Sequence, residues 1–271
     1  MSALPAEQTS PAQNTNQACA YVLHGLNTNP ARMEELGDVL RKMNIQTSVG
    51  TLSGHSQIPE KNEEISAPRW AKEFAEQWIN ATATCKKKND KRIFVGYSLG
   101  ALTAMSVFDS QKSPILPTQM ILLSPALNFR YKVMMIRSIA WLPFGSLPSL
   151  NHPDYRARPT TPLRSYNALF ELHSEWKNNS WRATASIPTL VVLSEKDELV
   201  DSQAVAKTIT EKRLDRWNIL WISNDDAPLS PRYYHLMIDQ RSMGARAWHT
   251  LKETLEKSIP QSDQESPKNA R

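Results

Sequence analysis

The chain of 271 residues has little of several features that mark specialised protein classes. Its two cysteines, Cys19 and Cys85, are too few for a disulfide-rich scaffold. Each lies at or shortly before a predicted strand, so one bridge between them is conceivable, but the sequence favours two free buried thiols. No group of His, Cys, Asp and Glu has the spacing of metal ligands, so we predict no metal and no other cofactor.

Long apolar runs are also absent, and no stretch of about 18 apolar residues suggests a membrane span. The first residues lack the charged-then-apolar plan of a signal peptide. Residues 1–17 are rich in Gln, Asn, Ser, Thr and Pro, which predicts a disordered leader, and residues 261–271 read as a flexible tail. We expect a cytoplasmic protein by default; a periplasmic or secreted one is the alternative if the polar leader is a mature N-terminus.

Positive charge is only slightly in excess, with a formal net charge of +5 and an isoelectric point near 9.1. The basic residues are scattered, apart from the run Lys86 to Lys88 with Lys91 and Arg92. That run precedes a predicted strand whose far end carries the candidate nucleophile. It therefore reads as a solvated loop remote from the active site, and we predict no nucleic-acid partner.

What the sequence does contain is a regular alternation of short apolar strands and amphipathic helices. Such an alternation predicts an α/β fold with a mostly parallel central sheet covered by helices on both faces. The predicted domain spans residues 18–260. Its strands are expected at residues 19–23, 45–49, 91–95, 120–123, 189–193 and 217–222, and its helices near residues 29–43, 68–82, 101–105, 164–181, 202–213 and 241–257.

The pentapeptide Gly96-Tyr97-Ser98-Leu99-Gly100 joins one of these strands to an Ala- and Leu-rich helix. A G-x-S-x-G sequence in this context is typical of a nucleophile elbow. The turn is too tight for Cβ atoms at the glycine positions, and the strained serine exposes its hydroxyl at the end of the sheet. Ser98 is therefore the predicted nucleophile.

A serine hydroxyl needs a base, and the base needs a group that holds its tautomer. Asp197 follows the strand at 189–193 and His235 follows the last strand, so the order Ser, Asp, His suits this fold. Alternative acids remain open. Glu195 and Glu198 flank Asp197, Asp201 resembles a helix cap, and Asp225 and Asp226 end the last strand.

The oxyanion of the reaction needs backbone donors. The N–H of Leu99, directly after Ser98, and the N–H of Leu26, after the first strand, are the candidates. We expect His55 and Tyr97 to contact substrate. His24 is expected to bond to backbone, and the remaining histidines at 152, 173 and 249 are expected to be surface or structural residues.

These motifs together resemble the serine-hydrolase branch of the α/β-hydrolase superfamily, in particular the bacterial carboxylesterase and monoacylglycerol-lipase-like group. The matching segments are residues 24–27, 54–55, 96–100, 194–200 and 235–239. The resemblance implies Ser98 as nucleophile, Asp197 as acid, His235 as base, and Leu26 and Leu99 as oxyanion donors. It departs from the family at Ala101, Tyr234 and Ser56, where the family often has glycine.

The resemblance also implies a cap between the sixth and seventh strands, where the Pro-rich segment 127–186 breaks the alternation. Apolar residues between Met134 and Phe144 read either as core or, with Arg130, Lys132 and Arg137, as a surface for transient contact with a membrane.

The predicted activity is hydrolysis of carboxylic esters with small or lipid-like acyl groups, of the monoacylglycerol or lysophospholipid type. A thioesterase or acyltransferase with the same three residues is the first alternative, and a non-catalytic binding member of the fold is the second. The fold alone does not decide between them.

Overall fold

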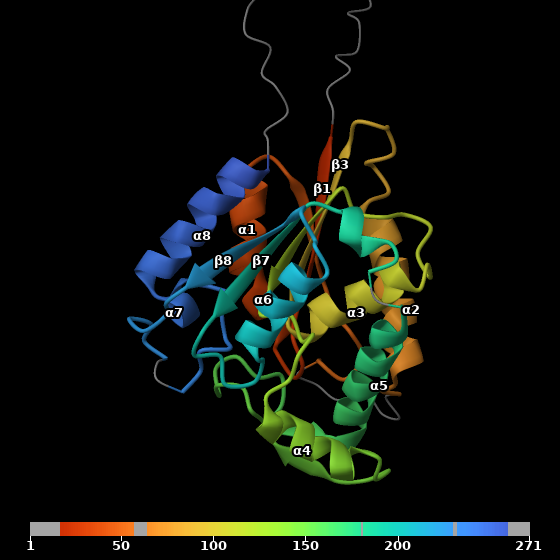
Figure 1. Cartoon of the computed structure of the whole chain (residues 1–271), viewed down its shortest axis with the longest axis vertical. Helices are drawn as coiled ribbons and strands as arrows, with labels where there is room; N and C mark the ends of the chain where they lie inside the picture. The colour runs from red at the N-terminus through yellow and green to blue at the C-terminus, as the bar shows by residue number, and fades with distance from the viewer. Residues whose placement is uncertain (1–16, 57–63, 180, 230–231, 260–271) are drawn as a thin grey trace, which may run out of the picture.

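The computed structural model describes residues 17–56, 64–179, 181–229 and 232–259. At its centre lies a six-stranded sheet in the order β2-β1-β3-β4-β7-β8, in which all neighbours run parallel (Figure 1). The parallel α/β architecture predicted from the sequence is confirmed. The strands are β1 (Ala18–Leu23), β2 (Gln46–Gly50), β3 (Lys91–Tyr97), β4 (Gln119–Leu123), β7 (Thr189–Ser194) and β8 (Trp217–Ile222).

Helices cover both faces of the sheet, with α1, α7 and α8 on one side and α2, α3, α5 and α6 on the other (Figure 1). Asn29 and Asp201 cap the helices that follow them, as expected, since each side chain accepts a backbone N–H two or three residues ahead. The helices are η1 (Pro30–Met33), α1 (Glu34–Lys42), α2 (Ala67–Ala81), α3 (Leu99–Asp109), α4 (Tyr131–Ala140), α5 (Leu163–Asn179), η2 (Thr184–Ser186), α6 (Ser202–Glu211), α7 (Gln240–Met243) and α8 (Ala245–Ser258).

The inner strands β1, β3, β4 and β7 are largely buried on both faces, so their side chains pack alternately into two apolar clusters. In β1, Tyr21 and Leu23 pack with α2 and α3, while Ala20 and Val22 pack with α1 and α8. This period of two explains why the strands read as unbroken apolar runs rather than as alternating ones. All of the loops that carry candidate site residues leave the sheet at its carboxyl edge.

The segment between β4 and β7 forms a cap. Helix α4 lies at the end of the molecule away from the chain termini, and the short strands β5 (Ser146–Pro148) and β6 (Thr160–Pro162) pair antiparallel after it (Figure 1). Helix α5 then returns to the main body and packs against α3. The predicted leader, apart from Gln17, and the predicted tail lie outside the described residues. None of the helices in the described part of the chain combines the length and apolar character needed to cross a bilayer.

The expectation of two free thiols is wrong, because Cys19 and Cys85 form a disulfide across a Cα separation of 6.2 Å. Cys19 begins β1, and Cys85 lies in the turn after α2. Both positions fall at the amino-terminal edge of the sheet, which brings them together although 66 residues separate them in sequence. Both side chains are buried, so the bond is shielded from solvent.

Loss of this disulfide is expected to destabilise the fold. Closing a loop of this length restricts the unfolded chain, which contributes about 2 to 4 kcal/mol to the free energy of unfolding. The double variant Cys19→Ser/Cys85→Ser should therefore unfold at lower urea concentration than the oxidised protein. Wild type in reducing buffer is the control that leaves the buried sulfur atoms in place. Equal midpoints for oxidised and reduced wild type would contradict the prediction.

Candidate active site

Ser98 stands on the turn between β3 and α3, with a backbone φ of 50° that places a non-glycine residue in the left-handed region. The two flanking glycines allow α3 to approach the sheet closely. A Cβ on Gly96 would lie 2.7 Å from the backbone of Ala101, and one on Gly100 would lie 2.6 Å from the carbonyl oxygen of Leu23. The sequence therefore folds here as a nucleophile elbow.

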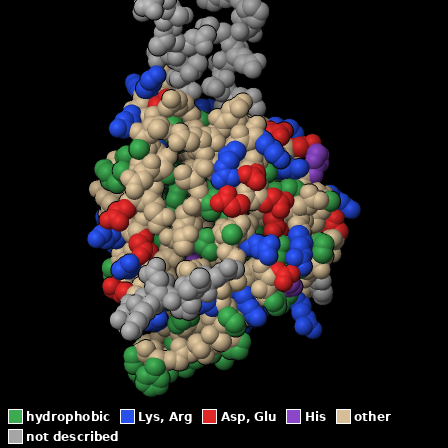
Figure 2. All heavy atoms as spheres, turned by 180° about the vertical axis from the view of Figure 1, so that it is seen from behind, with side chains coloured by type: hydrophobic (Ala, Val, Ile, Leu, Met, Phe, Trp, Pro, Cys, Tyr) green, Lys and Arg blue, Asp and Glu red, His purple; other side chains and the backbone are tan. Residues whose placement is uncertain are grey.

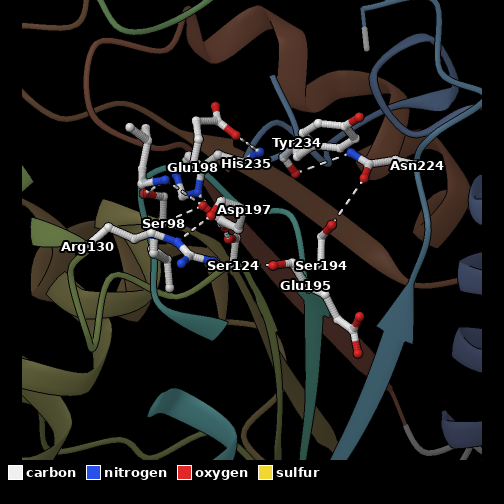
Figure 3. Close-up of polar contacts among 12 residues, drawn as sticks. Ser98, Ser124, Arg130, Ser194, Glu195, Asp197, Glu198, Asn224, Tyr234 and His235 are labelled. Carbon is white, nitrogen blue, oxygen red and sulfur yellow. Dashed lines mark hydrogen bonds and ion pairs between the residues drawn. The ribbon is translucent and has the colours of Figure 1, made fainter. Parts of the chain in front are cut away.

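Three side chains from three separate loops form a continuous hydrogen-bonded chain (Figure 3). The Oγ of Ser98 lies 2.9 Å from Nε2 of His235, and Nδ1 of His235 lies 2.8 Å from Oδ2 of Asp197. All three side chains are buried, Asp197 completely. The structure thus brings together the three residues that the sequence assigned to a triad.

Asp197 is held by more than the histidine. Its Oδ1 accepts the backbone N–H groups of Leu199 and Val200, each at 2.8 Å, and Ser124 donates its hydroxyl to Oδ2. Burial raises the pKa of the carboxyl, but His235 and these donors outweigh burial and hold the pKa below its usual value. Asp197 is therefore ionised at neutral pH.

His235 has an environment that favours its protonated form. Burial lowers its pKa, but the charges of Asp197 and Glu198 more than compensate, so the net pKa is raised. Glu198, considered as an alternative acid, accepts the backbone N–H of His235 at 2.9 Å instead of bonding to the ring. Burial raises the pKa of Glu198 itself.

Ser124 is a member of this site that the sequence reasoning did not identify. It directly follows β4 with a φ of 42° and is fully buried. Its Oγ lies 3.0 Å from Nδ1 of His235 and donates to Asp197. The sequence held a usable signal, because Ser124 directly follows the strand beside β3 and neighbouring parallel strands end at the same edge.

The cap is tied to the loop that carries Asp197. The guanidinium of Arg130, just before α4, donates to the carbonyl oxygens of Asp197 at 2.7 Å and Glu195 at 3.2 Å. On the other side of the loop, Ser194 donates to Asn224, whose amide donates to the carbonyl oxygen of Tyr234 (Figure 3). These bonds fix the loop that carries Asp197, here called the acid loop, relative to the loop that carries His235.

A cavity of about 520 Å³, including its open mouth, leads to Ser98 and His235. Its wall is mainly apolar and comes from the loop after β1, the elbow, the cap and the acid loop. The hydrogen bonds among the described residues consume neither the N–H of Leu26 nor that of Leu99. Lining residues are Leu26, Asn27, Tyr97, Ser98, Ala126, Phe129, Val133, Ser149, Leu150, Asn151, Thr161, Tyr166, Leu169, Leu199, Val200 and His235.

Of the two predicted substrate contacts, Tyr97 lies at the cavity and His55 does not. Tyr97 lines the cavity, with its ring 5.2 Å from that of His235. His55 does not reach it, contrary to prediction. Its Nδ1 bonds to the backbone carbonyls of Leu52 and Ser53, and its ring packs between those of His24 and Trp70. Its loop turns into the core instead of toward the elbow.

The other titratable candidates lie elsewhere. Asp225 pairs with Lys196, while His173 bonds to the carbonyl of Leu127 and His249 pairs with Glu253. Within the described ranges, no three His, Cys, Asp or Glu side chains are arranged to hold a metal ion.

The loop after β1 is bonded to the cap strand segment 149–161. The side-chain amide of Asn27 donates to Ser149 and Thr161, and the amide of Asn151 donates to the carbonyl oxygen of Leu26 at 2.8 Å. A backbone bridge joins Thr28 to Arg156. The peptide at Leu26 is thus oriented by the cap as well as by the sheet.

Comparison with known proteins agrees with this geometry. Residues 14–161 match the family model described as serine aminopeptidase, S33, which is more than half of the chain. The chain belongs to this family of α/β hydrolases. No curated protein matches it.

Solved structures share the fold of this hydrolase. A monoacylglycerol lipase from Paleococcus ferrophilus aligns with a TM-score of 0.63 and 17% identity over 90% of this chain and 97% of its own. A soluble variant of the monoglyceride lipase of Saccharomyces cerevisiae aligns at 0.68 and 12%, covering 92% and 90%. Est1E from Butyrivibrio proteoclasticus with bound ferulic acid aligns at 0.55 and 17%, covering 91% and 90%. At these identities the likeness shows the fold alone.

Because His24 and His55 are buried, we expect the free energy of unfolding to fall in acid. Nδ1 of His24 donates to Gly25 and its Nε2 accepts from the N–H of Leu52, so protonation would break the second bond. Burial lowers the pKa of His24 well below its usual value and that of His55 to about 4. In the unfolded chain both histidines have a pKa of about 6.5. As the pH falls below that value, the unfolded chain binds protons that the folded protein does not, which favours unfolding.

The contribution of His24 and His55 to the free energy of unfolding should therefore be constant above about pH 6.5 and fall by up to about 1.4 kcal/mol per pH unit per histidine toward pH 4. Urea titrations across this range measure the slope. The His55→Gln variant keeps an N–H donor without the titration and should show a shallower slope. An identical slope in that variant would contradict the assignment.

Proposed function

We propose that this chain is a serine hydrolase that cleaves carboxylic esters with small or lipid-like acyl groups through an acyl-enzyme. The observation that carries the proposal is the hydrogen-bonded series from Ser98 through His235 to the buried carboxylate of Asp197. This series is the arrangement needed to make a serine hydroxyl nucleophilic at neutral pH.

In the proposed mechanism His235 takes the proton of Ser98 through Nε2 while Oγ forms a bond to the ester carbonyl carbon. Asp197 holds Nδ1–H and stabilises the imidazolium that results. The tetrahedral intermediate collapses, the carbon–oxygen bond to the alcohol breaks, and the alcohol leaves with the proton from His235. Water then attacks the acyl-enzyme with His235 again as base, which releases the acid and restores the hydroxyl of Ser98.

The negative oxygen of the intermediate requires donors at the start of α3 and in the loop after β1. The free N–H groups of Leu99 and Leu26 are the proposed pair. The amino-terminal end of α3 adds a favourable partial positive charge. Because only backbone atoms act here, the side chains at these two positions do not decide the chemistry.

The cavity favours esters over the peptides suggested by the family description. An enzyme that removes amino-terminal residues must bind a free ammonium group, which calls for a carboxylate in its pocket. Among the described residues that line the cavity, none is acidic, and apolar side chains predominate. Such a wall suits an acyl chain.

Two alternatives use the same site. A thioesterase or acyltransferase would share the three residues and differ in the leaving group or acceptor, and rates on thioester and oxygen-ester substrates of equal chain length separate them. A non-catalytic binding protein would have no need of the strained backbone at Ser98 or the buried charge of Asp197.

The test is hydrolysis of p-nitrophenyl esters from acetate to palmitate by wild type and Ser98→Ala. We expect wild type to be active and the variant to lose at least about 1,000-fold in kcat/KM, because the nucleophile is absent. The chain-length optimum will report the size of the acyl site. Ser186→Ala, an exposed serine far from the cavity, is the matched control and should retain full activity.

A folded wild type that is inactive on every chain length would refute the ester proposal. Activity that survives in Ser98→Ala would refute the assigned nucleophile. Activity confined to thioesters would favour the first alternative.

We also propose that the protein works in an oxidising compartment such as the periplasm or the exterior, rather than in the cytoplasm. The support is the buried Cys19–Cys85 disulfide, because such bonds persist mainly outside the reducing cytosol. If reduced and oxidised wild type have equal midpoints in the urea experiment above, the disulfide does not support an oxidising compartment.

A further inference from the structure

The cap presents large apolar side chains to solvent. On α4, Tyr131, Met135 and Ile139 form one row at a spacing of four residues, and Trp141 and Phe144 follow the helix. Tyr131, Trp141 and Phe144 are 80%, 69% and 77% exposed. We call these five residues the cap face. Exposed aromatic side chains grouped in this way mark an interaction surface.

The segment that carries the cap face has charge of one sign. Residues 128–153 contain Arg130, Lys132 and Arg137 but no Asp or Glu. Lys132 and Arg137 are both exposed on α4. Figure 2 shows hydrophobic side chains gathered at this end of the molecule, away from the mixed red and blue charges of the main body. An apolar surface on a segment of positive charge is complementary to an anionic lipid surface.

The cap face is continuous with the entrance to the cavity. Phe129 and Val133, on either side of the start of α4, line the cavity from the cap. Leu150 lines the cavity too, yet is 42% exposed, so it marks the mouth. An acyl chain that leaves a lipid layer beneath the cap face would meet apolar side chains along its way to Ser98.

We propose that the cap face docks on an anionic lipid surface, where it admits acyl esters from that surface to the cavity. The role of docking in delivering substrate rests on the proposed function, whereas the docking itself does not. Trp141 and Phe144 enter the interfacial region, and Lys132 contacts lipid phosphates. Arg137 adds positive charge from its place beside Ser174 and Phe170 on α5. The contact is reversible, because it rests on a few side chains.

Flotation with vesicles tests the docking. Vesicles of phosphatidylcholine alone are compared with vesicles that contain about one third phosphatidylglycerol, at low and high salt. Wild type should float with the anionic vesicles, and high salt should weaken its binding. Trp141→Ser/Phe144→Ser should bind at least about tenfold less, because it loses most of the inserted apolar area. Trp221→Ser removes a partly exposed tryptophan on β8, away from the cap, and is the matched control.

The outcomes separate docking from catalysis. Neither Trp141 nor Phe144 lines the cavity, so the double variant should hydrolyse a soluble short-chain ester at the wild-type rate. Binding of the double variant equal to wild type, or no binding by wild type, would overturn the docking proposal, and so would equal binding to both kinds of vesicle. Vesicle binding by a protein that hydrolyses nothing would leave docking intact and refute the proposed function.

An independent observation concerns Ser124. Its hydroxyl lies between the two partners whose pairing sets the basicity of the site, since it donates to Oδ2 of Asp197 and lies 3.0 Å from Nδ1 of His235. The residue does not line the cavity. We infer that Ser124 is a positioning residue, which acts on the reaction through Asp197 and His235 without touching substrate.

Removal of this hydroxyl should change the pKa of His235 in a definite direction. The hydroxyl proton faces Asp197 and offsets part of its negative charge. Without it, Asp197 attracts the imidazolium of His235 more strongly, which raises the pKa of His235 further. Since the base must be neutral to accept a proton, the acid limb of the rate profile moves to higher pH. The carboxylate also loses a restraint, so kcat falls.

The test compares kcat and KM of wild type, Ser124→Ala and Ser186→Ala on a soluble ester over roughly pH 5 to 9. Ser124→Ala should show an acid limb raised by about half a unit and a kcat reduced about tenfold at an unchanged KM. Ser186 is exposed and lies outside the cavity and its hydrogen-bond network, so Ser186→Ala should keep the wild-type profile.

A purely structural role would lower stability and leave the pH profile in place. Thermal unfolding of the variants is therefore measured alongside the kinetics. If the acid limb of Ser124→Ala coincides with that of wild type, the positioning role is refuted. If Ser124→Ala fails to fold, Ser124→Cys, which is close in size and a weaker donor, should give a smaller shift in the same direction.

Discussion

The site depends on the close approach of α3 to the ends of β1 and β3. Gly96 and Gly100 permit that approach, because a Cβ atom at either position would meet backbone atoms at under 3 Å. The tight turn between them forces Ser98 into the left-handed region. Any residue with a side chain at the two glycine positions would push α3 away from the sheet and remove Ser98 from the reach of His235.

Around the elbow, hydrogen bonds between loops hold the remaining groups, in addition to the apolar packing of residues such as Leu236 and Val200. Among the described residues, four donors reach the carboxylate of Asp197: two backbone N–H groups, the ring of His235 and the hydroxyl of Ser124. Such complete pairing is what allows a carboxylate to remain ionised while fully buried. Arg130 extends the same network into the cap. The charge at the centre of the site is therefore also what holds its loops together.

Much of this could be predicted from the sequence, and the exceptions have physical reasons. The apolar strands were located to within two residues, and Ser98, Asp197 and His235 were identified because their spacing follows from the order of strands in a parallel sheet. The placement of His55 was wrong, because the direction in which a loop turns depends on packing against Trp70, which no local pattern encodes. The Cys19–Cys85 bond joins residues that are 66 positions apart in sequence, and only the folded sheet brings them together. Ser124 was not predicted, because a single serine after a strand has no sequence motif that distinguishes it from other serines.

The bonds between the cap and the loop after β1 limit how the cap can move. A lid that swung open as one body over residues 127–162 would have to break the bonds of Asn27 and Asn151 and the bridge from Thr28 to Arg156. These bonds hold the carbonyl oxygen of Leu26 and the side chain of Asn27, so such an opening would also release the loop after β1, which carries the proposed oxyanion donor Leu26. Arg130 holds the other end of the cap to the loop of Asp197. A motion of the cap that keeps both sets of bonds can therefore involve only the segment between them, residues 131–148, which includes α4.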